Sequence, residues 1–139
     1  MHFVTGGAFN GKAEWVRTFY RLHDQNSSRW YSAYRGDALP KDLPGSRLVV
    51  LEGIEQWILQ TGEAFNRNAG KEWLAAWLAW EKSGERKIVL IGTDISKGIV
   101  PMEREVREWR DVTGRFYQDA AKCCNRFDWI WYGVAKRLK

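Results

Sequence analysis

The sequence has no long hydrophobic run, and it is poor in cysteine, proline and histidine. No apolar stretch reaches the roughly 18 residues that a membrane-spanning helix needs, so we expect no transmembrane segment. Its first residues include no basic segment followed by an apolar stretch, and we expect no secretory signal. The two cysteines, Cys123 and Cys124, are neighbours and are poorly placed to bridge each other. These absences favour a reduced, cytoplasmic setting.

Charged and hydrophobic residues are both abundant. Of the 139 residues, 45% are hydrophobic and 28% are charged, which is typical of one globular domain with a sizeable core. The formal net charge of +5 suits an anionic ligand such as a nucleotide, and it would equally suit nucleic acid. The basic residues are scattered, with one small cluster at Lys136, Arg137 and Lys139. We therefore expect a solvated basic surface and no nucleic-acid partner.

Apolar patterning predicts strands that alternate with helices. Continuous apolar or aromatic runs indicate strands at 1–7, 29–34, 48–51, 87–92 and 127–132. Helical periodicity covers 12–23, 55–66, 71–82 and a long segment after Pro101. Residues 36–46 contain two prolines and are expected to form a loop. The alternation predicts an α/β fold with a mainly parallel sheet.

The segment after the first expected strand fits the P-loop pattern G-x-x-x-x-G-K. An apolar strand precedes it and a helix follows, the context in which backbone N–H groups and a helix N-terminus bind phosphate. Lys12 would contact the β- and γ-phosphates and offset the charge that builds during transfer. A glycine-rich turn without a ligand is the less favoured alternative. The predicted nucleotide site comprises Gly6, Gly7, Ala8, Phe9, Asn10, Gly11, Lys12 and Ala13.

The metal-binding position of the P-loop is altered. P-loop enzymes place Ser or Thr after the lysine as a Mg²⁺ ligand, and this chain has Ala13, which has no side-chain oxygen. Mg²⁺ would then depend on phosphate oxygens, water and an acidic residue. Glu52 ends a buried strand and is the leading candidate for that residue, with a structural ion pair as an equal alternative. Asp94 follows the next strand, and there a structural role is favoured.

Tryptophan is unusually frequent, with nine residues. Trp73, Trp77 and Trp80 follow spacings of four and three and would share one helical face. Packing in the core or at a subunit interface is the favoured explanation. A flat apolar wall for a large planar ligand is the functional alternative.

Several segments together resemble one known family. The most specific is 88–101, which ends in Gly98-Ile99-Val100-Pro101, and 109–115 and 114–139 add to it. The entry into the glycine loop, 4–8, and the strand end Val50-Leu51-Glu52 are similar as well. In these segments the chain resembles the bifunctional adenosylcobinamide kinase/adenosylcobinamide-phosphate guanylyltransferase family of cobalamin biosynthesis.

The resemblance implies a RecA-like P-loop fold of three layers, with 1–139 forming a single nucleotide-binding domain that assembles as a trimer. It implies that ATP or GTP binds at Gly6 to Lys12, that Lys12 and Glu52 are catalytic, and that Glu52 helps to hold Mg²⁺. Members of the family phosphorylate the aminopropanol hydroxyl of adenosylcobinamide. They then transfer GMP from GTP through a guanylylated histidine.

The chain also departs from that family. The family's histidine lies in the pattern H-R-x-x-R-P, whereas residues 24–47 contain no histidine, and His23 is explained as a helix-end residue. A nucleophile cannot be replaced by positioning alone, so we expect guanylyl transfer to be lost. Polar family positions are also changed at Phe9, Asn10, 92–94 and Tyr117. The sequence leaves three hypotheses: a reduced kinase, an inactive nucleotide-binding paralogue that pairs with or regulates a complete member, or a scaffold without nucleotide.

Overall fold

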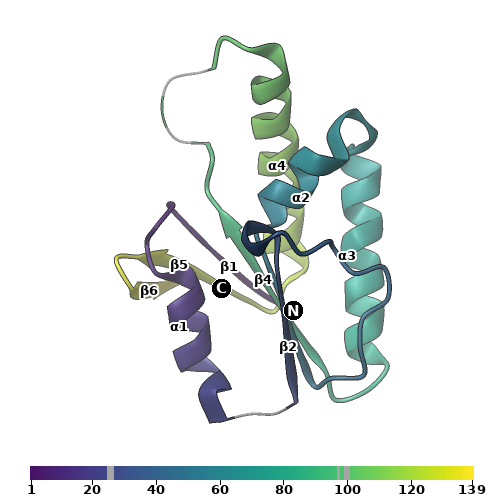
Figure 1. The fold of residues 1–139 in the computed structure, drawn as a ribbon, viewed down its shortest axis with the longest axis vertical. Coiled ribbons are helices and arrows are strands. Elements are labelled where there is room, and N and C mark those ends of the chain that lie inside the picture. The colour runs from purple at the N-terminus through teal and green to yellow at the C-terminus, as the bar shows by residue number, and fades with distance from the viewer. Residues whose placement is uncertain (25–26, 97, 99–100) are drawn as a thin grey trace.

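The computed structural model describes residues 1–24, 27–96, 98 and 101–139. A six-stranded sheet in the order β2-β3-β4-β1-β5-β6 forms the centre, with α1 on one face and α2, α3 and α4 on the other (Figure 1). Neighbouring strands from β2 to β5 are parallel, and β6 is antiparallel to β5. The fold is therefore α/β with a mainly parallel sheet, as the sequence predicts.

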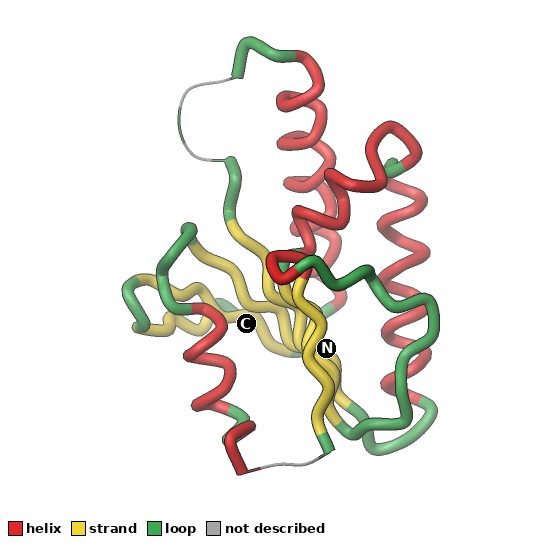
Figure 2. Tube along the Cα trace, viewed as in Figure 1, coloured by secondary structure: helices red, strands yellow, loops and turns green. Residues whose placement is uncertain are grey.

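The strands are β1 (His2–Gly6), β2 (Ser28–Ser32), β3 (Leu48–Glu52), β4 (Lys87–Thr93), β5 (Arg126–Trp131) and β6 (Val134–Arg137). The helices are α1 (Lys12–Phe19), α2 (Ile54–Thr61), α3 (Arg67–Lys82) and α4 (Arg104–Cys123). Short 3₁₀ turns lie at Leu22–Asp24 (η1), Ala33–Arg35 (η2) and Gly62–Ala64 (η3). Figure 2 shows how the helices enclose the strands. No helix in the described ranges is both long and apolar enough to cross a bilayer.

The central strands are buried on both faces, which explains their continuous apolar runs. Alternate residues of β1, β3 and β4 point to opposite sides. Phe3, Leu51 and Leu90 belong to the core under α2, α3 and α4. Val4 and Val89 belong to the core under α1. The predictions of buried strands at 1–7, 48–51 and 87–92 are confirmed, within a residue or two at their ends.

Several predicted boundaries are shifted for local reasons. The predicted helix 55–66 ends at Thr61, because Gly62 follows with φ 68° and ψ −141°, a non-helical conformation open chiefly to glycine. The next helix begins earlier than the predicted 71, because the Asn66 side chain caps it by accepting from Ala69 N at 2.9 Å. The predicted helix 12–23 ends at Phe19, and Arg21 then adopts φ 53°.

The strand β6 was missed by the sequence analysis. It pairs with β5 through a two-residue turn of Tyr132 and Gly133, with φ of 49° and 75°. Such a turn needs positive φ at both positions and normally carries Asn-Gly or Asp-Gly. A tyrosine gives no such signal, so the hairpin was not predicted.

The tryptophan stripe packs α3 onto the core. Trp77 is buried, and Trp73 and Trp80 are partly buried against the same cluster. The Trp73 ring centroid lies 4.8 Å from that of Phe65 and 5.8 Å from that of Trp77. Core packing, the favoured explanation, accounts for these side chains.

Candidate functional site

The neighbouring strands β1 and β4 lead to opposite faces of the sheet. After Gly6 the chain enters α1, whose Val16 packs on one face, and the helix that follows β4 is α4, whose Phe116 packs on the other (Figure 1). Asp94 N donates to Gly6 O at 2.8 Å and joins the two strand ends. Ligands of open α/β sheets bind at such a reversal, outside the carboxyl ends of the strands.

The loop from Gly6 to Lys12 lies at this reversal. A Cβ on Gly6 would lie 2.2 Å from Ile130 O, so only glycine fits there, and Gly11 adopts φ 84° at the start of α1. Asn10 O accepts from Gly133 N at 2.8 Å. Residues 8 and 9 form a hydrogen-bonded turn, and among the described residues no protein acceptor is found for the other backbone N–H groups of residues 7–12. The loop therefore offers a set of free donors beside the positive end of a helix.

Lys12 bends back over this loop. Its side chain is buried, and Nζ donates to Gly7 O at 2.7 Å. Burial lowers the pKa of this amine, and the negative charges of Glu55 and Glu52 act in the opposite direction. An ammonium group has three donors, and Gly7 O is the one acceptor that Lys12 has among the described residues.

Glu52 lies at the carboxyl end of β3, as expected. Its Oε1 accepts from Trp30 Nε1 at 3.2 Å, and the side chain is partly exposed. Within the described ranges Glu52 forms no ion pair, so the structural alternative for this residue finds no support there. Its other carboxylate oxygen, Oε2, has no hydrogen bond to a described residue.

Glu55 is a buried carboxylate that the sequence analysis did not select. Its Oε1 accepts from Thr93 N at 2.7 Å, and its Oε2 accepts from Tyr34 Oη at 3.0 Å. Burial raises the pKa of Glu55 above its usual value, although the hydrogen bonds from Tyr34 and Thr93 favour the charged form. A glutamate in the first turn of a helix is common for dipole reasons, so no sequence signal distinguished it.

Side chains from η2, β4 and α4 hold Glu55 in place. Tyr34 Oη lies 2.8 Å from Thr93 Oγ1, and Tyr117 Oη donates to Thr93 O at 2.8 Å. Trp109 Nε1 donates to the backbone oxygen of Glu55 at 2.8 Å. Burial raises the pKa of both tyrosine hydroxyls, Tyr34 and Tyr117, well above the usual value, so both are donors at neutral pH.

The donor set at this edge fits a magnesium ion only together with phosphate. No group of three or more His, Cys, Asp or Glu side chains that could hold a metal exists in the described ranges. Mg²⁺ commonly binds one or two carboxylates, several waters and substrate phosphates. Glu52 could supply one such carboxylate through Oε2, which has no hydrogen bond to a described residue. Ala13 adds no oxygen, so the protein supplies little of the coordination itself.

Asp94 and His23 have structural explanations, as predicted. Asp94 Oδ1 accepts from Ser96 N at 2.9 Å and from Ser96 Oγ at 2.5 Å, within the turn that follows β4. His23 is exposed, with Nε2 3.9 Å from Glu14 Oε1, and it follows the end of α1 opposite to Lys12. Of the segment that carries the resemblance, Lys97, Ile99 and Val100 lie outside the described residues.

A cavity of about 330 Å³ lies between the sheet and α4, next to Asp94. Four aromatic side chains, Phe3, Tyr117, Phe127 and Trp129, form part of its walls. Thr113 also lines it, and the Thr113 hydroxyl is buried without a hydrogen-bond partner among the described residues. This cavity adjoins the strand ends that carry the loop.

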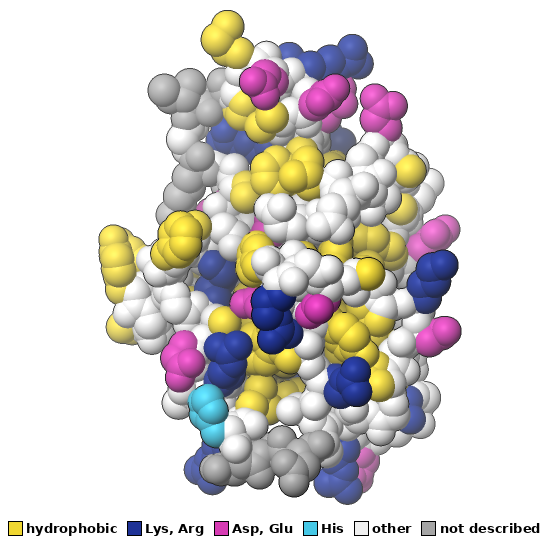
Figure 3. Space-filling model, in the orientation of Figure 1, with side chains coloured by type: hydrophobic (Ala, Val, Ile, Leu, Met, Phe, Trp, Pro, Cys, Tyr) yellow, Lys and Arg dark blue, Asp and Glu magenta, His cyan; other side chains and the backbone are white. Residues whose placement is uncertain are grey.

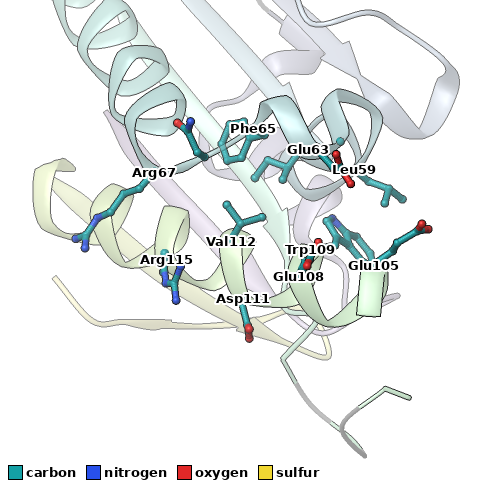
Figure 4. Close-up of a pocket in the computed structure, with 13 residues that line it drawn as sticks. Leu59, Glu63, Phe65, Arg67, Glu105, Glu108, Trp109, Asp111, Val112 and Arg115 are labelled. Carbon is teal, nitrogen blue, oxygen red and sulfur yellow. The ribbon is translucent and has the colours of Figure 1, made fainter. Parts of the chain in front are cut away.

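A larger cavity of about 480 Å³ lies between α4 and the segment that joins α2 to α3. Trp109 and Val112 form part of its apolar floor, and charged side chains such as Glu105, Arg67 and Arg115 stand around it (Figure 4). None of the loop residues 6–13 lines this cavity. It is therefore separate from the candidate phosphate site.

No protein-family model matches the chain, and a comparison with curated proteins gives no match either.

Proposed function

We propose that the chain binds ATP or GTP, with the phosphates in the loop Gly6–Ala13, and transfers the γ-phosphoryl group to an alcohol. Adenosylcobinamide, which the resemblance indicates, is the proposed acceptor. The observation that carries the proposal is the loop that leads into α1, whose N–H groups lie beside the buried Lys12 and at the reversal between β1 and β4. The start of α1 adds the positive end of a helix to these donors, which favours an anion at the loop.

The chemistry follows from the charges around the loop. A bound triphosphate would draw the Lys12 ammonium from Gly7 O to its β- and γ-oxygens and stabilise the transferred group. The acceptor hydroxyl forms the new bond to γ-phosphorus while the bond to the β–γ bridging oxygen breaks. The hydroxyl proton would pass to solvent, and the buried Glu55, whose oxygens accept from Thr93 and Tyr34, would help to hold the strand ends in place. Mg²⁺, when bound between Glu52 and the phosphates, would neutralise charge on the β- and γ-oxygens.

A second candidate function is nucleotide binding without catalysis, in a paralogue that pairs with or regulates a complete family member. Ala13 favours it, because the missing hydroxyl removes a metal ligand that matters more for transfer than for binding. A scaffold that binds no nucleotide is the third and weakest candidate. From the resemblance we also propose that the chain forms a homotrimer and lies in the cytoplasm. Light scattering of the purified protein tests the trimer, and fractionation of cells tests the location.

Calorimetric titration with ATP and GTP, with and without Mg²⁺, tests the proposal. We expect binding by the wild type and its loss in Lys12→Ala, because the buried ammonium supplies the charge that the phosphates need. Lys41→Ala, at an exposed lysine of the 36–46 loop, is the matched control and should bind normally. Absence of binding by the wild type to either nucleotide would reject both the kinase and the inactive-paralogue functions.

A further inference from the structure

Three aromatic side chains stand exposed beside the phosphate loop. Phe9 at the tip of the loop, Trp131 and Tyr132 have relative exposures of 103%, 64% and 79%, and we call them the aromatic rim. The loop and the β5–β6 turn touch, since Asn10 O accepts from Gly133 N and a Cβ on Gly11 would lie 3.4 Å from Gly133 Cα. Figure 3 shows hydrophobic side chains projecting on the side of this hairpin, at the left.

The backbone at two of these residues is unfavourable for an aromatic. Phe9 has φ 60° and Tyr132 has φ 49°, a left-handed conformation that suits Gly, Asn or Asp and is rare for bulky residues. Neither side chain gains burial in return. Core packing and turn geometry therefore both fail to explain why these positions are aromatic, and strained exposed residues of this kind gather at ligand sites.

The sheet order separates the rim from the acidic groups. β4 and β3 lie on one side of β1, and they carry Thr93 and Glu52 at their ends. β5 and β6 lie on the other side of β1, and their turn carries the rim. A triphosphate with its γ-phosphate near Lys12 and Glu52 would extend along the loop toward the β5–β6 turn. Its base would then leave the loop at the rim.

The rim has the chemistry of a stacking surface. The Trp131 and Tyr132 rings lie 5.8 Å apart between centroids, with 32° between their planes. An aromatic face binds any base through its π-surface, without reading the hydrogen-bonding edge. We propose that Phe9, Trp131 and Tyr132 bind the purine base of the nucleotide by stacking. This inference rests on the proposed function, and it adds that adenine and guanine bind about equally well.

Titrations with ATP, GTP and inorganic tripolyphosphate test the inference, on the wild type, Trp131→Ala and Tyr132→Asn. Asparagine suits the left-handed position, so Tyr132→Asn should fold. We expect each substitution to weaken ATP and GTP binding by roughly tenfold, as the loss of one stacking ring does, and to leave tripolyphosphate binding unchanged. Leu138→Ala, an exposed apolar residue after β6 and away from the turn, is the control and should change neither.

The outcomes separate the inference from the proposed function. If the wild type binds neither tripolyphosphate nor nucleotide, the proposed function fails and the inference falls with it. If tripolyphosphate binds as tightly as ATP, or both substitutions leave ATP binding unchanged, the function stands and base stacking is rejected. A third result, in which the substitutions change the sedimentation of the protein and not its affinity for ATP, would also overturn it and would identify the rim as a contact between copies of the chain.

Discussion

The two ends of the sheet both bury charged groups, yet they use them differently. At the amino end, His2 Nε2 lies 2.6 Å from Asp128 Oδ2 and its Nδ1 lies 2.6 Å from Tyr20 Oη. Arg126 donates to both Asp128 oxygens, at 2.7 and 3.3 Å. At the carboxyl end, Lys12 has one protein acceptor in the described ranges, and most loop N–H groups have none there.

This difference separates a structural network from the proposed binding site. Buried polar groups in folded proteins are nearly always paired, so the complete network at the amino end needs nothing further to explain it. Most loop groups at the carboxyl end are at least partly exposed, and they are the ones to which we propose that the phosphates bind. We therefore expect substitutions at the amino end to change the free energy of unfolding, and those at the carboxyl end to change ligand binding and phosphoryl transfer.

The largest effect is expected from Asp128→Ala. Its carboxylate is 1% exposed and pairs with both His2 and Arg126, so its removal leaves buried polar groups without a partner. We expect a loss of about 3–5 kcal/mol in the free energy of unfolding. Urea denaturation measures this, and Asp42→Ala, at an exposed aspartate, should change it little.

Nucleotide affinity measured on the folded fraction of Asp128→Ala should equal that of the wild type. A variant that unfolds as the wild type does, or one that stays folded but loses nucleotide binding, would break the proposed division between the two ends of the sheet.

Acidification should destabilise the protein through His2. Burial lowers the pKa of His2 from 6.5 to about 4, so the unfolded chain takes up this proton at a higher pH than the folded one. Stability is therefore lost as pH falls from about 6.5 to about 4, by roughly 3 kcal/mol at 1.36 kcal/mol for each unit. Denaturation at a series of pH values should show this loss in the wild type and a much smaller one in His2→Gln.

The raised pKa of Glu55 acts with the opposite sign over part of this range, because there the folded state binds the proton more readily. That contribution is common to both proteins and cancels in the difference between wild type and His2→Gln. The chain's other histidine, His23, is exposed, and His23→Gln is the matched substitution to compare with His2→Gln. If the free energy of unfolding falls equally with pH in wild type and His2→Gln, the buried imidazole does not cause the pH dependence.

Much of the carboxyl end was predictable, because its residues follow one another in sequence. The loop Gly6–Lys12 and the strand-end Glu52 both follow from apolar runs that close at a glycine or a carboxylate. The surroundings of Glu55 were not predictable. Tyr34 is 21 positions away from Glu55 and Thr93 is 38 positions away. Only the order of the strands brings these groups together, and no local pattern encodes that order.

The same limit applies to the amino end and to the β5–β6 hairpin. His2 and Asp128 are 126 positions apart, and each alone reads as an ordinary strand residue. The hairpin was missed for a different reason, because a tyrosine occupies the first turn position in place of asparagine. An exposed residue that does not fit the conformation of its turn indicates a constraint other than folding, such as ligand binding.

A smaller effect is expected from adding the missing oxygen at the carboxyl end. Ala13→Ser restores the hydroxyl that P-loop enzymes use as a metal ligand. If the protein is a reduced kinase, Mg²⁺-dependent phosphorylation of adenosylcobinamide should rise by about tenfold, with nucleotide affinity little changed, because the added ligand acts on the transferred group. The transfer is measured with ATP labelled at the γ-phosphate, as label that appears in adenosylcobinamide.

Ala79→Ser provides the matched control, since it adds the same hydroxyl at an exposed position of α3, away from the loop. No transfer by either the wild type or Ala13→Ser, with binding intact, would favour the inactive paralogue over the kinase.

The smallest effect concerns the strain at the β5–β6 turn. Tyr132 holds φ 49° without burying its ring, whereas asparagine tolerates this conformation. Tyr132→Asn should therefore raise the free energy of unfolding by about 0.5–1 kcal/mol, seen as a higher urea midpoint at an unchanged slope, while it weakens ATP binding. Gly133→Ala, at φ 75°, should move stability the other way. If the replacement stabilises the fold and weakens ATP binding, the tyrosine serves ligand binding and not stability. If Tyr132→Asn is instead less stable than the wild type, the tyrosine stabilises the hairpin.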